Sequence, residues 1–209
     1  MQEIYAFFSH FRMAASAEEL EIPVIDISAI SLIHVDVGNK NYGTIGEKLH
    51  QALGNVGFAY LANHGIPAKI VEDCMREAKT FFQLPIEEKK RFSRGDVSNP
   101  HGYSAVGREV LENNDIIEEK ESFDCHSIDP RASYPDEKVP KLRGSVRFLA
   151  HQAIILARRL LRSIGEDLTP DPLKFLHAHS EIFAERNSTS LRLLHYPPIK
   201  GNELNQSCK

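Results

Sequence analysis

Two short motifs in the sequence carry residue types that can bind a metal ion. His34-Val35-Asp36 pairs an imidazole with a carboxylate, and His177 stands nine residues before Arg186-Asn187-Ser188. Two histidines and one carboxylate on a shared face can hold a transition-metal ion with positions left open for other ligands. Largely helical sequence separates the two motifs, and three-residue matches occur by chance in a chain with ten histidines. We therefore interpret both as surface features and assign no catalytic or metal-binding residue to them.

The elements that would position any site are predicted as α+β, with helices and short strands sharing one chain. In the first half, Asn63-His64-Gly65 is a turn because glycine tolerates positive φ and asparagine bonds nearby backbone. His64 is accordingly interpreted as a structural residue. The elements predicted around this turn are a strand at 22–27, a Gly/Asn-rich break at 38–43, a helix at 45–53 ended by Gly54, a strand at 57–61 and a helix at 67–82.

In the second half, apolar residues at helical spacing predict a long helix over 142–164 that Gly165 closes. Asp171-Pro172 predicts the start of another helix, because aspartate caps helices and proline suits their first turn. The other predicted elements are a charged turn at 87–91 opened by Pro85, a strand at 121–125, and a strand at 191–196 stopped by Pro197-Pro198.

Composition restricts the class of protein. Hydrophobic residues make up 42% and charged residues 26%, as in a globular protein, and the net charge of −4 argues against nucleic-acid or anionic-membrane binding. No run approaches the ~20 apolar residues of a membrane span. Cys74, Cys125 and Cys208 lie far apart, which suits free thiols in a reducing compartment. We expect a cytoplasmic protein.

Six segments in order resemble the N-terminal region of the isopenicillin N synthase-like oxygenases, which depend on Fe(II) and 2-oxoglutarate. They are IPVID, GFAYLANHGI, TFFQLPIEEKKRF, HGY, KESFD and NSTSLRLLHYPP, and they cover almost all of residues 21–198. The resemblance implies a helix-rich N-terminal part wrapped on a double-stranded β-helix, or jelly roll.

The resemblance also implies a domain plan. Residues 1–20 are expected to be a loosely held extension, 21–186 the N-terminal domain of a non-haem dioxygenase, 187–198 the first part of the barrel, and 199–209 a divergent tail. Eight strands with their connections need roughly 80 residues, and only 19 remain from Leu191 to Lys209. The barrel is therefore expected to be incomplete.

Relatives place a His-x-Asp iron motif just after the strand that ends in Tyr-Pro. Here Tyr196-Pro197 is present, but residues 198–209 contain no histidine. We therefore expect this chain to bind neither the Fe(II) nor the 2-oxoglutarate of the family. The resemblance nevertheless implies two cosubstrate-facing residues, Tyr196 and Arg192, although Leu194 stands where relatives often have asparagine. It also places Tyr103 and Glu109 in a loop that borders the substrate mouth.

Two main hypotheses for function remain. The first is the N-terminal portion of a 2-oxoglutarate dioxygenase, inactive in this form, whose full-length relatives act on small molecules. The alternative is a non-catalytic binding or dimerisation module that uses the helix-rich domain and self-associates through the open strand edge at 191–196. A third hypothesis is an active enzyme that uses His34 and Asp36.

Overall fold

The computed structural model describes residues 21–95, 101–108, 119–125, 132–180 and 190–198. Its elements, in chain order, are β1 (Val24–Asp26), a 3-10 turn (Ser28–Ile30), α1 (Asn39–Asn55), β2 (Tyr60–Ala62), α2 (Ala68–Phe82), α3 (Ile86–Lys90), β3 (Gly102–Ser104), β4 (Glu121–Cys125), α4 (Leu142–Leu168), α5 (Pro172–Ala178) and β5 (Leu191–His195). This mixture of helices and strands confirms the predicted class. Among the described residues, no helix has the length and apolar character needed to cross a membrane.

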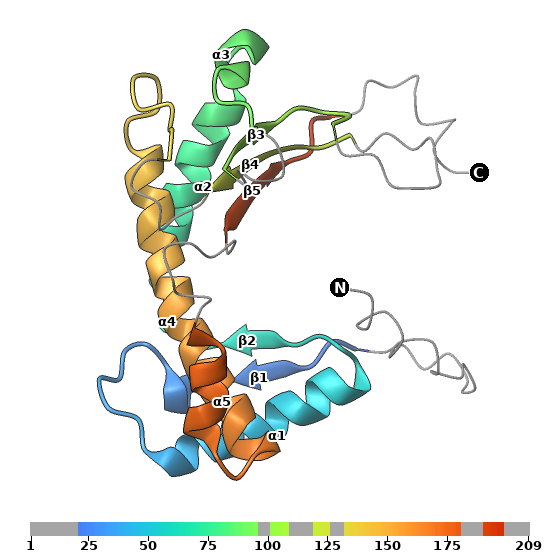
Figure 1. The fold of residues 1–209 in the computed structure, drawn as a ribbon, viewed down its shortest axis with the longest axis vertical. Coiled ribbons are helices and arrows are strands. Elements are labelled where there is room, and N and C mark those ends of the chain that lie inside the picture. Colours follow the sequence, from blue (N-terminus) through green and yellow to red (C-terminus); the bar gives the residue numbers. More distant parts are fainter. Residues whose placement is uncertain (1–20, 96–100, 109–118, 126–131, 181–189, 199–209) are drawn as a thin grey trace, which may run out of the picture.

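Helix α4 runs the length of the molecule and joins two groups of elements (Figure 1). We call the group formed by α2, α3, β3, β4, β5 and the start of α4 the sheet lobe. We call the group formed by β1, β2, α1, α5 and the rest of α4 the helix lobe. Each lobe has its own apolar cluster: Leu142 and Val146 of α4 belong to the first, and Leu156 of α4 belongs to the second.

In the helix lobe, α1 packs along the second half of α4 and covers the parallel pair of β1 and β2. The predicted break at residues 38–43 is wrong, because α1 already begins at Asn39 and continues through Gly43. Gly43 faces open space, and the ring of Tyr42 beside it lies 4.8 Å from the Arg162 guanidinium of α4. Contact with α4 thus supports a first turn that the local sequence disfavours.

Gly165 does not close α4, which continues to Leu168. A Cβ atom added at Gly165 would come within 3.1 Å of the Phe175 ring and 3.3 Å of Pro172. The close approach of α5, rather than the end of a helix, therefore favours glycine at this position. The predicted cap of α5 is confirmed, because the Asp171 carboxylate accepts a hydrogen bond from the Lys174 N–H at 3.0 Å.

The turn between β2 and α2 lies at the predicted residues, but the predicted hydrogen-bond partner of Asn63 is wrong. Asn63 and Gly65 both have positive φ, at 60° and 83°. The imidazole Nδ1 of His64 accepts a hydrogen bond from the Ile66 N–H at 3.0 Å, which confirms the structural interpretation of this histidine. Asn63 donates to the Asp26 carboxylate at 3.0 Å instead of bonding to the backbone.

The sheet lobe contains the antiparallel sheet β3-β4-β5. Its inner face packs on the end of α2, where the Phe81 ring makes edge contacts with Tyr103 and Phe123 at centroid distances of 5.9 and 4.8 Å. Strands β4 and β5 match the predicted strands at 121–125 and 191–196. Strand β3 was not predicted, because three residues are too few for a period-two pattern.

Candidate functional site

The described residues with the greatest concentration of buried charge surround β4, the central strand of the sheet lobe. All five residues of β4 are buried, and carboxylates project from both of its faces. Glu121 lies on the same face as Phe123, toward α2, whereas Asp124 lies on the opposite face, because side chains alternate along a strand. A buried carboxylate is tolerated only with partners, so each one defines its own cluster.

Glu121 is at the centre of the first cluster. Its carboxylate is 2.6 Å from the Lys89 ammonium and 2.8 Å from the His195 Nδ1, and it accepts a short hydrogen bond from the Tyr103 hydroxyl. Lys89 also donates to the Phe82 carbonyl at 3.0 Å. Burial by itself would raise the pKa of Glu121, but these hydrogen bonds outweigh burial and hold the pKa below its ordinary value. The cluster joins α3 to all three strands.

Asp124 is at the centre of the second cluster. Arg192 of β5 donates to its carboxylate at 2.6 and 3.1 Å through two nitrogens, and Arg94 donates at 3.1 Å. Asp124 is 2% exposed, so two guanidiniums compensate one buried charge. Arg192 and Asp124 are direct cross-strand partners in the register of β4 and β5.

The predicted cosubstrate residues lie on this second face. Tyr196 follows β5, continues the alternation of Arg192 and Leu194, and is 67% exposed. Arg192 is also on this face, but its guanidinium already binds Asp124. The structure therefore brings the two residues to the same face of the sheet, where both are exposed, but the Arg192 guanidinium is held by Asp124.

Of the second predicted pair, Tyr103 and Glu109, the structure describes only Tyr103. Tyr103 was expected in a loop, but it lies in β3 and is 1% exposed on the α2 face, opposite to Tyr196. The loop assignment is wrong because β3 pairs with β4 in register with Phe123. Burial and the bond to Glu121 raise the pKa of the Tyr103 hydroxyl. Glu109 lies outside the described residues.

The described residues contain no group of three His, Cys, Asp or Glu side chains that could hold a metal ion. His34 and Asp36 are exposed in the loop before α1, and the His34 carbonyl accepts a hydrogen bond from Arg159. His177 lies on α5, and residues 186–188 lie outside the described part. The described residues thus do not supply the ligand set that an iron centre needs.

Known proteins share both the sequence pattern and the fold of this chain. The family model for the N-terminal region of non-haem dioxygenases in morphine synthesis matches residues 22–145, more than half of the chain. The chain belongs to the Fe(II)- and 2-oxoglutarate-dependent oxygenase superfamily. The family prediction is therefore confirmed.

Curated relatives of this oxygenase chain include fungal and plant enzymes. Proline hydroxylase buaE of Petromyces alliaceus is 30% identical over 76% of this chain and 51% of its own length. Oxoglutarate-dependent flavonoid 7-O-demethylase 1 of Ocimum basilicum is 30% identical over 88% of this chain and 46% of its own length. The chain spans about half the length of the curated relatives it matches.

Solved structures show the same fold. A full-length Neurospora crassa protein in complex with alpha-KG superposes with a TM-score of 0.69 and 22% identity, over 92% of this chain and 60% of that one. A 2OG-Fe(II) oxygenase family protein of Caulobacter crescentus gives a TM-score of 0.66 and 22% identity, over 88% of this chain and 58% of that one. These likenesses establish the oxygenase fold for the matched region.

Sequence reasoning missed the two charge clusters. The available signal was the strand Glu121 to Cys125, in which the two carboxylates, Glu121 and Asp124, are three positions apart and so lie on opposite faces. Carboxylates on both faces of a strand require cations on both faces if the strand is buried. The sequence does not show that this strand is buried or which cations it meets. Lys89 is 32 residues from Glu121, and Arg192 is 68 residues from Asp124.

Proposed function

We propose that this chain forms the N-terminal portion of a 2-oxoglutarate- and Fe(II)-dependent dioxygenase, and that these 209 residues alone do not bind iron or turn over substrate. The observation that carries the proposal is the match of residues 22–145 to the family, together with the lack of a metal-ligand group among the described residues. Residues 198–209, which follow the Tyr196-Pro197 pair, also contain no histidine.

Within such a dioxygenase, Tyr196 would face the cosubstrate. Its exposed hydroxyl can donate to a carboxylate oxygen of 2-oxoglutarate. Arg192 would position this face rather than bind the cosubstrate itself, since its guanidinium is held by the buried Asp124. The two clusters around β4 thus act as supports that hold the strand before Tyr196 in place. The substrate would be a small molecule, as the names of the proline and flavonoid relatives suggest.

An anaerobic titration with Fe(II) and 2-oxoglutarate tests the proposal. A full-length relative, such as the Neurospora crassa protein solved with alpha-KG, serves as the positive control and is expected to give the charge-transfer band of the ternary complex. The 209-residue chain is expected to give no band, because two histidines and a carboxylate must converge on the metal. A clear band from this chain would show that the proposal is wrong.

One observation favours the second function, a binding or dimerising module. Strand β5 pairs with β4 on one side only, and no strand among the described residues pairs with its other edge. Leu194 and Tyr196 are exposed next to that edge. Open edges of this kind recruit further strands.

Size-exclusion chromatography over a range of concentrations tests the module. Association through β5 is supported if the chain dimerises and Leu194→Lys abolishes the dimer. The matched change Leu173→Lys on α5 should leave the dimer intact. Leu173 is a suitable control because it is exposed in the other lobe. A chain that stays monomeric at all concentrations would exclude self-association through β5.

A further inference from the structure

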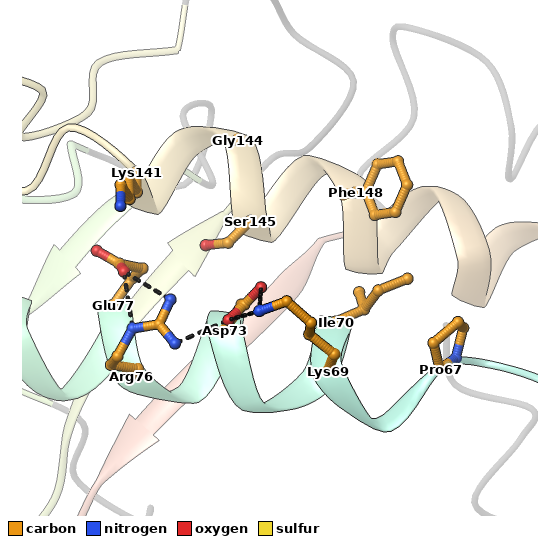
Figure 2. A pocket seen from close by; sticks show the side chains of 10 residues that line it. All are labelled: Pro67, Lys69, Ile70, Asp73, Arg76, Glu77, Lys141, Gly144, Ser145 and Phe148. Atoms are coloured by element: carbon orange, nitrogen blue, oxygen red, sulfur yellow. Dashed lines mark hydrogen bonds and ion pairs between the residues drawn. The ribbon is translucent and has the colours of Figure 1, made fainter.

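A groove of about 560 Å³ lies between α2 and the start of α4. Figure 2 shows Ile70 of α2 and Phe148 of α4 on opposite sides of it, with Pro67 near the same end. Phe148 is 56% exposed, although it belongs to a helix whose other face is buried. An exposed phenylalanine beside an apolar groove marks a surface that is suited to apolar side chains.

The charged residues along the groove neutralise one another. Asp73 accepts hydrogen bonds from Lys69 at 3.1 Å and from Arg76 at 2.7 Å, and Arg76 also binds Glu77 at 3.2 Å (Figure 2). Their charges are thus satisfied within α2. Lys141 stands at the end of the groove away from Phe148. The groove therefore suits an apolar occupant better than a strongly charged one.

The first twenty residues contain a matching apolar pattern. Ile4, Phe7, Phe8 and Phe11 follow the spacing i, i+3, i+4, i+7, which places apolar side chains on one side of a helix. In helical form, residues 4–11 would be ~12 Å long at ~1.5 Å per residue. The α4 wall, from Lys141 to Phe148, also has eight residues and is ~12 Å long by the same measure. The lengths of the pattern and the groove agree.

We propose that residues 4–11 of this chain dock in helical form into the groove between α2 and α4. The three phenylalanines would cover Ile70 and Phe148, in the way that amphipathic helices bind apolar grooves. The expectation that residues 1–20 are loosely held makes the opposite prediction.

The chain is long enough for this docking. Val24 pairs with Tyr60, ~5 Å away across the sheet. Seven residues, at most ~25 Å, lead from Tyr60 to Pro67 at the end of the groove. The thirteen residues from Phe11 to Val24 reach ~43 Å when extended. This length exceeds the path of ~30 Å that those two steps allow.

Photo-crosslinking of the full chain tests the proposal. A benzophenone amino acid replaces Phe8 in one variant and Ser9, on the opposite side of the pattern, in the other. Phe8 is expected to crosslink within the monomer to peptides that contain Ile70 or Phe148. Ser9 is expected to give much less of this product, because its side chain would point away from the groove.

A pair of groove variants makes the test specific. Phe148→Asp is expected to remove the Phe8 crosslink, whereas Leu168→Asp on the far end of α4 is expected to keep it. The two residues are matched, since both are 56% exposed, so loss of the fold would affect both variants alike. Equal crosslinking from Phe8 and Ser9, a product at another surface, or a crosslinked dimer would each overturn the proposal. The last result would identify a second copy as the occupant.

Discussion

The two lobes along α4 bury different kinds of groups. In the sheet lobe, Lys89, Glu121 and Asp124 are buried together with the aromatic rings of the core. In the helix lobe, the buried polar residues that the structure describes are the hydroxyl-bearing Ser31 and Ser163, and the core is otherwise aliphatic. One lobe therefore depends on pairing charges in a medium of low dielectric, and the other on close contact between backbones.

The buried charges of the sheet lobe and the close packing of the helix lobe have different roles. The charges hold the strand before Tyr196 in position, whereas the close packing mainly affects the stability of the fold. A buried ion pair seldom stabilises a protein more than apolar residues of the same shape, but it penalises any arrangement that separates the charges. Such pairs at β4 restrict the register of the strand that precedes Tyr196. In the helix lobe, the approach of Gly46 to the Ser163 carbonyl restricts only how closely α1 and α4 pack. Four predictions test this contrast.

The largest effect is expected from Lys89→Met. This change leaves the Glu121 carboxylate buried without its cation, and we expect a loss of ~3–5 kcal/mol in the free energy of unfolding. The double variant Lys89→Met/Glu121→Leu should recover most of the loss, because neither charge remains. Urea unfolding followed by circular dichroism measures both values.

The control for this prediction is Lys90→Met, the neighbouring residue on α3. Lys90 pairs with Glu87 at 3.2 Å on the surface, so its loss should cost less than ~1 kcal/mol. If the single and double variants lose equal stability, burial of an unpaired charge is not the cause of the effect.

Acid should lower the free energy of unfolding by protonating the Glu121 carboxylate. The loss should not exceed the loss expected from breaking the Lys89–Glu121 pair. The pKa of Glu121 is lower in the folded chain than its ordinary value of 4.5. Its ionised form therefore stabilises the fold at neutral pH, and this contribution is lost as the pH falls below 4.5 through the folded pKa. Glu121→Gln should flatten the dependence of the urea midpoint on pH in this range. Glu87→Gln, at an exposed position, should leave the dependence unchanged.

An intermediate effect is expected from Gly46→Ala in the helix lobe. The new Cβ atom would lie 2.1 Å from the Ser163 carbonyl oxygen, so α1 must move away from α4 at a cost of ~1–3 kcal/mol. Gly43→Ala on the same helix meets nothing within 4 Å and should instead stabilise by ~0.5–1 kcal/mol. Thermal unfolding of both variants measures the difference. Shifts of the same sign would contradict the close-packing explanation.

The smallest effect is expected from Asp171→Ala. This change removes the side-chain cap of α5 and should cost ~1 kcal/mol. Asp36→Ala, at an exposed loop position of the same lobe, should change stability by less than ~0.5 kcal/mol. Chemical denaturation of the two variants distinguishes a cap from a general effect of lost negative charge.

The sequence by itself determined the family, most of the elements and the N-terminal cap of α5. The strands at Glu121 to Cys125 and Leu191 to His195, the turn at Gly65 and the cap at Asp171 were predictable because each depends on residues a few positions apart. The predicted position of Tyr196 on the face of Arg192 also follows from the alternation of a single strand.

Only the tertiary structure decided which charges are buried and which glycines lie at close contacts between helices. Tyr103 proved to be a core residue because β3 pairs with β4, and Gly165 proved to be a contact because α5 folds back on α4. Glu121 is ionised inside the protein because Lys89 approaches it from 32 residues away. The free energy of a charge depends on everything that packs around it, and segments far apart in the sequence supply those neighbours.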